Sequence, residues 1–342
     1  MSPPKIAKIS ALAPSNSLAD ALAKSIATAA LPLDPNVPSA IWDTALLAPL
    51  LEFAQRPGKA FRDHLARLAY AGCDGNPALL PVQLGAIVEA IHAGSLIVDD
   101  VQDCSELRRG GPALHHLIGA PSAINSGSWM YFYALSQLFT LPMVAGQHAR
   151  VLQRALQTMM RCHQGQALDL SIRISDLEPC TIVAVTEATT RGKTGALMGF
   201  AGFLGAATAG ADVAACEAWA TFGENLGVGL QMLDDIGSVV ATDRVAKGIE
   251  DVSLGRVTWP WAWLTETCDE VTVRRLMQSA AQPSHDETLA IIAALASTVG
   301  QFGRARIHAH LLTTMAQLEP HANGETLNAL RHEIARLEAS YG

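Results

Sequence analysis

The sequence predicts an all-α protein. Hydrophobic residues make up 49% of its 342 residues and charged residues only 16%, so the chain can bury a sizeable core. Aromatic residues contribute 5% and alanine carries much of the apolar content, a composition that favours closely packed helices over sheets. Apolar residues recur at helical spacing, and we find no alternating strand pattern with hairpin turns.

Two parts are expected along the chain: an N-terminal extension over residues 1–36 and one helical domain over residues 37–342. In the extension, Ser17 to Ala30 forms a short amphipathic pattern, with Ser17 as N-cap and Asp20 in the first turn. In the domain, helical patterns separated by short breaks cover residues 45–54, 61–71, 79–98, 121–141, 151–172 and 182–210.

Composition argues against several classes of function. The net charge of −8 and the pI near 5.7 are unlike those of a nucleic-acid-binding protein, which needs a basic surface. The six cysteines form no CxxC pair, so reduced thiols in a cytoplasmic protein are expected rather than a zinc site. Thr194 to Ala211 contains no charged residue, but its many glycines and alanines favour a buried helix over a transmembrane segment.

A first acidic motif, Asp99, Asp100 and Asp103, follows an apolar helical pattern. If residues 87–106 form one helix, Asp99 and Asp103 stand at i and i+4, and both carboxylates project from the same face. These like charges repel each other, whereas magnesium binds carboxylate oxygens together with water and phosphate. The motif therefore predicts a metal-bridged diphosphate site, and the alternative is a solvated acidic helix end.

A second acidic motif ends another apolar helical pattern. Asp234 and Asp235 follow Gln231, and burying an aspartate there without a partner would cost several kcal/mol. A shared cation is the natural explanation, and two such motifs can face each other across a cavity and hold metal between them. Basic residues suited to phosphate follow each motif: Arg108 and Arg109 after the first, and Lys247 and Arg256 after the second.

These motifs and their neighbours resemble the trans-type polyprenyl diphosphate synthases, most closely the eukaryotic-type geranylgeranyl diphosphate synthases. The matching passages occur in family order, and they are PGKAFR (57–62), SLIVDDVQDCSELRRGGPALHH (95–116), INS (124–126), HQGQALDL (163–170), KTG (193–195), LQMLDD (230–235) and EDVSLGR (250–256). The resemblance implies a single-domain isoprenoid synthase bundle of helices around a central cavity. It also implies a homodimer, for which residues 121–141 are an interface candidate.

The resemblance implies a magnesium-dependent, head-to-tail condensation of isopentenyl diphosphate with an allylic prenyl diphosphate. Three Mg²⁺ ions would bridge the allylic diphosphate to the acidic motifs and stabilise the charge that develops on the leaving group. Matching the motifs residue by residue assigns the metal to Asp99, Asp103 and Asp234, and the allylic diphosphate to Arg108, Lys193 and Lys247.

The same matching assigns isopentenyl diphosphate, which binds without metal, to Lys59, Arg62, His92 and Arg109. Thr194 and Gln231 would line the carbocation with oxygen dipoles, and Asp169 would brace Lys193. Two alternatives stay open. Lys59 and Arg62 could be an exposed helix start, and His92 could be an ordinary core histidine.

Product length is expected to depend on residues along the helix before the first motif, at about 1.5 Å of rise per residue. Gly94 and Ser95 lie about one turn before Asp99, and both are small, so a growing chain should pass them. A Gly94→Phe replacement should therefore shorten the product. Beyond them lie Tyr131, Phe132 and His163, which resemble the residues that stop chain elongation in eukaryotic-type synthases. They predict a geranylgeranyl product, and the alternative is that they only pack in the core.

The sequence departs from the family pattern at a few positions. Ser238 stands where the last acid of the second motif would be, and we expect Ser238→Asp to be tolerated and to lower the magnesium requirement. Ala60 replaces a base of the first basic motif, and Arg256 replaces a lysine, which keeps the charge but not the compact ammonium.

Two other activities are compatible with these motifs. A class I terpene synthase on the same fold would ionise one prenyl diphosphate and cyclise it, and a catalytically silent subunit would modulate a synthase by dimerising with it. The retained residues for a second diphosphate argue against the cyclase. The intact metal ligands and Lys193 argue against the silent subunit, so a prenyl diphosphate synthase is the leading hypothesis.

Overall fold

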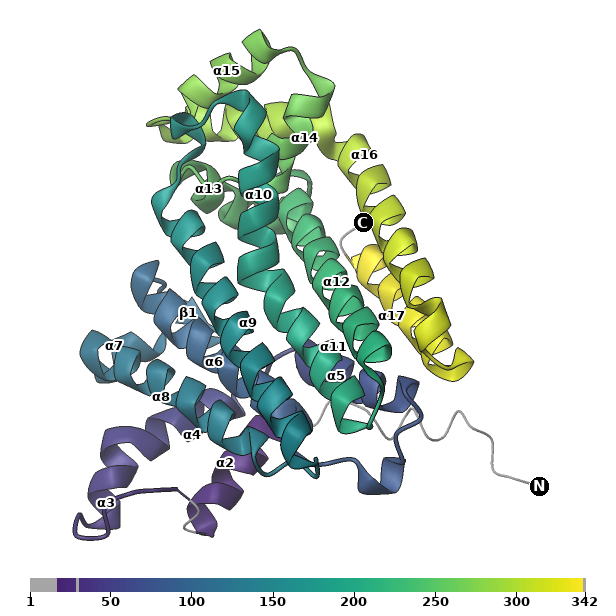
Figure 1. The fold of residues 1–342 in the computed structure, drawn as a ribbon. Coiled ribbons are helices and arrows are strands. Elements are labelled where there is room, and N and C mark those ends of the chain that lie inside the picture. The colour runs from purple at the N-terminus through teal and green to yellow at the C-terminus, as the bar shows by residue number, and fades with distance from the viewer. Residues whose placement is uncertain (1–16, 29–30, 341–342) are drawn as a thin grey trace. The chain divides into compact units, whose positions relative to one another are not determined.

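The computed structural model describes residues 17–28 and 31–340, and most of these residues are helical (Figure 1). The all-α prediction is confirmed, with one pair of two-residue strands as the exception among the described residues. The chain divides into two compact units: unit 1 runs to Ala155 and includes Phe200–Glu217, and unit 2 comprises Leu156–Gly199 and Ala218–Gly342. The single-domain organisation over residues 37–342 stays a prediction.

Unit 1 contains the N-terminal helices and the hairpin. Its elements are α2 (Ser17–Ala27), α3 (Ser39–Trp42), a π-helix η1 (Asp43–Leu47), α4 (Ala48–Gln55), α5 (Phe61–Gly72), a 3₁₀ turn η2 (Pro77–Leu79), α6 (Gln83–Gln102), β1 (Leu107–Arg108), β2 (Gly111–Pro112), α7 (Leu114–Ile118) and α8 (Ala120–Leu138). Three helices contribute residues to both units: α9 (Ala145–Ser171), α11 (Ala196–Thr208) and α12 (Val213–Val240).

The remaining elements belong to unit 2. They are the 3₁₀ turns η3 (Ile174–Asp176) and η4 (Pro179–Thr181), α10 (Ile182–Thr190), a π-helix η5 (Arg191–Gly195), η6 (Thr242–Arg244), α13 (Val245–Ser253), α14 (Trp259–Thr267), α15 (Glu270–Ser279), α16 (His285–Leu318), η7 (Glu319–His321) and α17 (Gly324–Ser340). α14 packs against α10 and α16, with Trp261 and Trp263 fully buried.

α6 is the central helix of unit 1 and packs against α2, α5 and α8. Leu84, Ile87 and Ile91 are buried at helical spacing, which gives α6 an apolar stripe for these contacts. α2 belongs to the same core because Leu22 is buried in it. The predicted N-terminal extension is thus partly a packed helix, and its residues 1–16 and 29–30 lie outside the described residues.

Helices α6 and α8 approach each other closely at two glycines. A Cβ added to Gly94 would lie 2.6 Å from the carbonyl oxygen of Gly127, and a Cβ on Gly127 would lie 2.9 Å from the carbonyl oxygen of Gly94. Such separations leave no room for a side chain. Gly94 therefore serves helix packing, and the passage of a growing product beside it stays a prediction.

The helix before the first acidic motif ends earlier than predicted, at Gln102 rather than Glu106. Cys104 has φ of +52°, and the N–H of Ser105 donates to the Asp100 carbonyl oxygen at 2.9 Å, which closes the helix with a Schellman-type turn. The chain then forms an antiparallel hairpin that the helical pattern did not predict. Arg109 and Gly110 have φ of +52° and +78°, the signs of a type I′ turn.

The predicted helix over residues 182–210 is interrupted by the π-helical turn η5. Such turns insert one extra residue, and they occur frequently at functional sites. Here the turn approaches α9 at two glycines, since a Cβ on Gly192 would lie 2.7 Å from the Cα of Gly165. Because only glycine permits this approach, the backbone that carries Lys193 is held directly against α9.

One described helix, His285–His321, is long and apolar enough to span a membrane by length and composition alone, and 39% of its apolar window is buried. The helix α16 packs against α13, α14 and α17 of the same unit, and its residues Ile291, Leu295 and Val299 are buried. These contacts account for the buried part of the helix as packing. The uncharged stretch Thr194–Ala211 that raised the transmembrane question forms the short buried helix α11 and its flanks.

Adding one methyl group at Gly94 should destabilise unit 1. We expect Gly94→Ala to lower the free energy of unfolding by about 1–3 kcal/mol, because the methyl must displace the Gly127 carbonyl. Gly146→Ala in α9 is the matched control, since no atom lies within 4 Å of its Cβ position. Urea unfolding measures both, and equal stability of the two variants would contradict the proposed close packing.

Candidate active site

The predicted site residues are divided between the two units. Unit 1 contains Lys59, Arg62, His92, Gly94, Ser95, Asp99, Asp103, Arg108, Arg109, Tyr131 and Phe132. Unit 2 contains His163, Asp169, Lys193, Thr194, Gln231, Asp234 and Lys247. Some of these residues contact one another within their unit: Arg108 lies beside Asp99 in unit 1, whereas Lys193 contacts Asp169 and Thr194 contacts Gln231 in unit 2.

The first acidic motif has two kinds of carboxylate. The N–H of Asp103 donates to the Asp99 carbonyl oxygen at 2.8 Å, so the helical turn continues and places both side chains on one face, as the spacing predicts. Asp100 instead is fully buried, and its Oδ1 accepts a 2.6 Å hydrogen bond from Arg108 Nε. Asp100 thus orients Arg108, whose Nη2 also lies 3.7 Å from Asp99 Oδ2.

Burial and the neighbouring charges together set the protonation of Asp100 and Arg108. Burial raises the pKa of Asp100 above its ordinary value, although the hydrogen bond and the charge of Arg108 oppose the shift. Burial also disfavours the charged form of Arg108, but the Asp100 hydrogen bond and the nearby carboxylates outweigh it and raise the pKa of Arg108. The guanidinium is therefore held charged next to the acidic motif.

A group of bases that we call the basic cluster comprises Lys59, Arg62, His92 and Arg109. Lys59 is exposed in the loop before α5, whereas Arg62 is half-buried in the first turn of that helix. Burial and the positive charges of Arg62 and Arg109 lower the pKa of His92 well below 6.5. His92 is therefore a neutral imidazole next to cations, an environment suited to an anionic ligand.

Two buried residues beside the basic cluster were missed by the sequence interpretation. Glu89 lies one turn before His92 on α6, and its charge acts on Arg62 and Arg109. Burial raises the pKa of Glu89, and these arginines oppose the shift. Arg56 is the second missed residue, and its i, i+4 spacing from Glu52 was the available signal.

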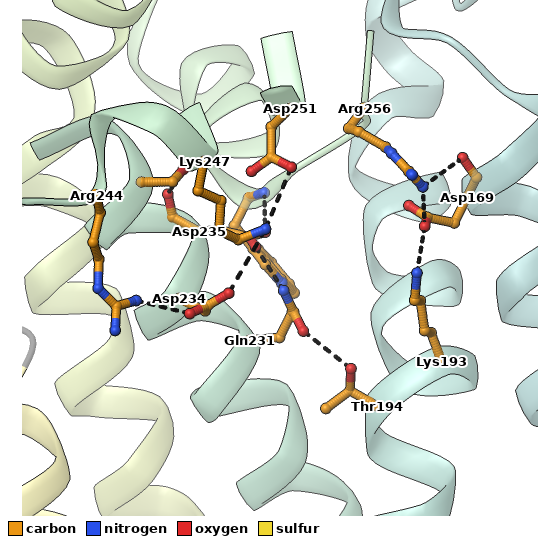
Figure 2. A network of polar contacts seen from close by, with 12 residues as sticks. Asp169, Lys193, Thr194, Gln231, Asp234, Asp235, Arg244, Lys247, Asp251 and Arg256 are labelled. Carbon is orange, nitrogen blue, oxygen red and sulfur yellow. Dashed lines mark hydrogen bonds and ion pairs between the residues drawn. The ribbon is translucent and has the colours of Figure 1, made fainter. Parts of the chain in front are cut away.

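In unit 2, Asp169 joins two cations (Figure 2). Its Oδ2 accepts a 2.6 Å hydrogen bond from Lys193 Nζ and also contacts Arg256 Nη1, which donates to the Asp169 carbonyl oxygen at 3.2 Å as well. Burial alone would raise the pKa of Asp169, but the charges of Lys193 and Arg256 outweigh it and lower that pKa. Asp169 therefore stays ionised and fixes both bases.

Thr194 and Gln231 are linked to the second acidic motif by a chain of hydrogen bonds (Figure 2). Thr194 Oγ1 donates to Gln231 Oε1 at 3.0 Å, and Gln231 Nε2 donates to Asp235 Oδ1 at 2.8 Å. Asp235 Oδ2 accepts from the Trp259 backbone N–H at 3.0 Å. Burial, with the charge of Asp251 nearby, raises the pKa of Asp235 to about 7. Asp235 is thus satisfied by protein donors, unlike a metal ligand.

Asp234 faces bases instead (Figure 2). Its Oδ1 accepts a 2.8 Å hydrogen bond from Arg244 Nη1, and its Oδ2 lies 3.9 Å from Lys247 Nζ. Lys247 Nζ also lies 3.4 Å from Asp251 Oδ1. Sequence reasoning did not assign Arg244 or Asp251 a role, although the i, i+4 spacing of Lys247 and Asp251 was visible.

The residues of unit 1 fit magnesium by donor chemistry. In the described part of the chain, no group of three or more His, Cys, Asp or Glu side chains is arranged as a metal site. Magnesium, however, needs only one or two carboxylates and takes water and phosphate at its other positions. Asp99 and Asp103 supply such a pair, and the adjacent buried Asp100 Oδ2 has no hydrogen-bond partner among the described residues. Asp99 and Asp103 would hold magnesium in unit 1.

The product-length residues are placed differently from the expectation. Gly94 packs against Gly127, and Ser95 Oγ donates to the His92 carbonyl oxygen on its own helix. Phe132 is 70% exposed, so it does not form the floor of a closed cavity within the chain. Tyr131 lies beside Gly94, with its Cε1 3.0 Å from the Cβ position there. In unit 2, His163 is exposed, and its Nδ1 lies 3.0 Å from the Met159 carbonyl oxygen.

The chain is similar to a family model and to known proteins over much of its length. A family model described as "Polyprenyl synthetase" matches residues 43–295. "Geranylgeranyl pyrophosphate synthase 2" of Zymoseptoria tritici is 30% identical over 220 residues, 64% of this chain and 64% of that protein. "Geranylgeranyl pyrophosphate synthase" of Eremothecium gossypii is 35% identical over 144 residues, 41% of this chain and 44% of that protein. The alignments thus span less than two thirds of these relatives.

Solved structures share the fold. The heptaprenyl diphosphate synthase of Staphylococcus aureus superposes with a TM-score of 0.76 at 17% identity, covering 99% of this chain and 99% of that one. The geranylgeranyl pyrophosphate synthase of Lactobacillus brevis gives a TM-score of 0.74 at 22% identity, covering 99% of this chain and 97% of that one. At such identities the likeness concerns the fold alone.

His92 should make stability depend on pH. Its pKa is lower in the folded than in the unfolded chain, so below pH 6.5 the unfolded state binds more protons and stability falls as pH falls, by at most about 1.4 kcal/mol per pH unit. His92→Gln removes this contribution, so urea unfolding should show wild type losing stability relative to the variant from pH 6.5 to pH 5. The difference should be constant above pH 7, and a difference that is constant throughout would contradict the assigned charge state.

Ser238→Asp should destabilise the protein, contrary to the expectation from the sequence. Ser238 is buried, its Oγ donates to the Asp235 carbonyl oxygen at 2.8 Å, and its own carbonyl lies 2.3 Å from the Cβ position of Gly248. A carboxylate there would be buried without a donor, and we expect a loss of roughly 2–4 kcal/mol in urea unfolding with EDTA. Ser238→Ala should lose only about 1 kcal/mol. Equal losses would refute this interpretation.

Proposed function

Because this chain belongs to the polyprenyl synthetase family, we propose that it is a prenyltransferase that condenses isopentenyl diphosphate head to tail with an allylic prenyl diphosphate, using magnesium. The observation that carries the proposal lies within unit 1. Helix α6 carries His92 of the basic cluster, and two turns later the acidic pair begins with Asp99, while Asp103 follows directly after the helix. The acidic pair suits a diphosphate bridged by metal, and the basic cluster suits a diphosphate bound without metal.

This pairing favours elongation over cyclisation. An enzyme that only ionises and cyclises one prenyl diphosphate needs a single diphosphate site. In this chain, Arg62, His92 and Arg109 share one environment in which positive charge predominates, and the half-buried Arg62 differs from an ordinary exposed helix start. Glu89 balances part of this charge, since it acts on Arg62 and Arg109, and the cluster still places several cations beside a neutral imidazole. Such a cluster suits the phosphate oxygens of a second diphosphate.

The residues of the acidic motifs would bind the allylic substrate. Asp99, Asp103 and Asp234 would hold magnesium, in the three-ion arrangement that the family resemblance implies. When bound, the metal neutralises charge on the departing diphosphate. Arg108, Lys193 and Lys247 would donate to the same diphosphate. Each of these bases is already oriented by a carboxylate, so little rearrangement is needed when phosphate oxygens arrive.

The chain's own dipoles would stabilise the reacting carbons. The allylic C–O bond breaks, the resulting carbocation bonds to the terminal alkene carbon of isopentenyl diphosphate, and a proton leaves to restore a double bond. Thr194 Oγ1 and Gln231 Oε1 lie 3.0 Å apart and supply oxygen atoms suited to facing a cation. The released diphosphate is the proposed proton acceptor.

The product we propose is geranylgeranyl diphosphate. Support comes from the names of the relatives above and from Tyr131, an aromatic residue beside α6. We also propose a homodimer formed through α8, since Ile124 and Phe132 on this helix are exposed apolar side chains, 45% and 70% respectively. A partner over this face would cover Phe132.

The test is an assay of purified protein with magnesium, labelled isopentenyl diphosphate and a series of allylic diphosphates. Wild type should elongate the allylic substrate, and Asp99→Ala or Asp103→Ala should lower kcat at least about 100-fold, because each removes a metal ligand. Glu106→Ala is the matched control, an exposed acid in the same segment, and should retain activity.

Two outcomes would overturn the proposal. Formation of a cyclic hydrocarbon from a prenyl diphosphate without isopentenyl diphosphate would identify a terpene synthase. No turnover of any substrate, or wild-type activity in Asp99→Ala and Asp103→Ala, would show that the acidic motif has another role.

A further inference from the structure

Arg56 lies directly after α4, and no sequence motif predicts its contacts with the hairpin. Its Nη1 donates to the Arg108 carbonyl oxygen at 3.1 Å and to the Pro112 carbonyl oxygen at 2.8 Å. Its Nε and Nη2 donate to the two carboxylate oxygens of Glu52, each at 2.9 Å. The side chain thus connects the end of α4 to both strands of the hairpin.

Arg56 is not itself suited to bind a ligand. The residue is only 8% exposed. Four hydrogen bonds occupy its guanidinium, which has about five N–H donors in all. The Cβ position of Gly111 lies 3.2 Å from its Cζ, so the hairpin backbone packs directly against the guanidinium. Arg56 therefore acts on the hairpin and not on a substrate.

The hairpin needs such support. Each strand is two residues long, and a two-stranded hairpin of this size is marginal in water. Its turn also places Arg109, a non-glycine residue, at φ of +52°, a conformation that costs free energy. Arg56 bonds to one carbonyl on each strand, Arg108 on β1 and Pro112 on β2, and so holds the two strands together.

The two consecutive arginines of the hairpin, Arg108 and Arg109, contact different partners. Arg108 extends toward Asp100 and the acidic motif, with Nε 2.6 Å from Asp100 Oδ1. The Cζ of Arg109 lies 5.6 Å from the centre of the Phe53 ring and 3.2 Å from the Cβ position of Gly58, beside the loop of the basic cluster. Arg56 contacts the same Phe53 ring, with its Cζ 5.4 Å from the centre. The position of Arg56 therefore affects both arginines.

We propose that Arg56 is a positioning residue that fixes the hairpin so that Arg108 and Arg109 each bind a different diphosphate. This inference rests on the proposed condensation of two diphosphates. The inference predicts that loosening the hairpin weakens the binding of both diphosphate substrates. Removing the Arg109 side chain alone should weaken the binding of only one substrate, isopentenyl diphosphate.

The test compares Arg56→Met, which keeps the length of the side chain and removes its donors, with Arg154→Met. Arg154 is the matched control because it also pairs with a glutamate, Glu217, and stacks on a phenylalanine, Phe203, but it contacts no part of the hairpin. KM and kcat are measured for both substrates, and amide hydrogen exchange is followed over residues 107–113. The exchange measurement requires no activity.

For Arg56→Met we expect KM to rise roughly tenfold for both substrates, as the loss of charge-assisted hydrogen bonds implies, while kcat falls less. Exchange over residues 107–113 should accelerate, including at the Ala113 N–H that donates to the Glu106 carbonyl oxygen at 2.9 Å. Arg56→Lys, which can keep one donor, should show an intermediate effect, and Arg154→Met should change neither KM nor the exchange. Glu52→Gln leaves the Arg56 donors in place and should show a smaller effect of the same kind if Arg56→Met does not fold.

Unchanged exchange over residues 107–113 in Arg56→Met would overturn the inference, whatever the enzyme does. So would a lower active fraction with both KM values unchanged, the signature of general destabilisation. A wild-type protein that incorporates no isopentenyl diphosphate would instead refute the proposed function, and the inference with it, whether or not Arg56 holds the hairpin.

Discussion

The hydrogen bond between the buried Asp100 and the partly buried Arg108 is the interaction on which the site residues of unit 1 depend. It joins the end of α6, which carries the acidic motif, to the hairpin, which carries the arginines. Leaving the Asp100 charge buried without Arg108 would cost several kcal/mol. Asp99 and Asp103, the turn at Cys104 and the hairpin are therefore placed together by one ion pair.

The same constraint organises unit 2. The proposed diphosphate binding needs several cations, and the cations of unit 2 named here have carboxylate partners in the structure. Asp169 fixes Lys193 and Arg256, and Asp234 contacts Lys247. Binding would exchange some of these carboxylate contacts for phosphate oxygens, which have a similar charge and geometry, so the exchange of partners costs little.

Glycines also position the helices, because they let two backbones approach each other closely. Gly94 with Gly127 brings α8 against α6, and Gly165 with Gly192 brings the π-helical turn against α9. The turn is thus anchored at the residue before Lys193, and the Cβ position of Gly165 lies 2.3 Å from the Lys193 nitrogen. The backbone at Gly94 and at Lys193 therefore cannot shift without breaking a helix contact.

The sequence alone determined the helical class, the family, the shared face of Asp99 and Asp103, and the pairing of Asp169 with Lys193 suggested by the motifs. The helical class and the shared face follow from local spacing and residue chemistry, whereas the family and the Asp169–Lys193 pairing follow from the resemblance of the motifs to a known family. Only the tertiary structure decided that Gly94 packs against a backbone, that Ser238 is buried, that Phe132 is exposed and that Arg56 supports the hairpin. The physical reason is that each of these features depends on contacts formed in the folded chain, many of them between segments distant in sequence. Arg56 and the Arg108 carbonyl, for example, are 52 positions apart.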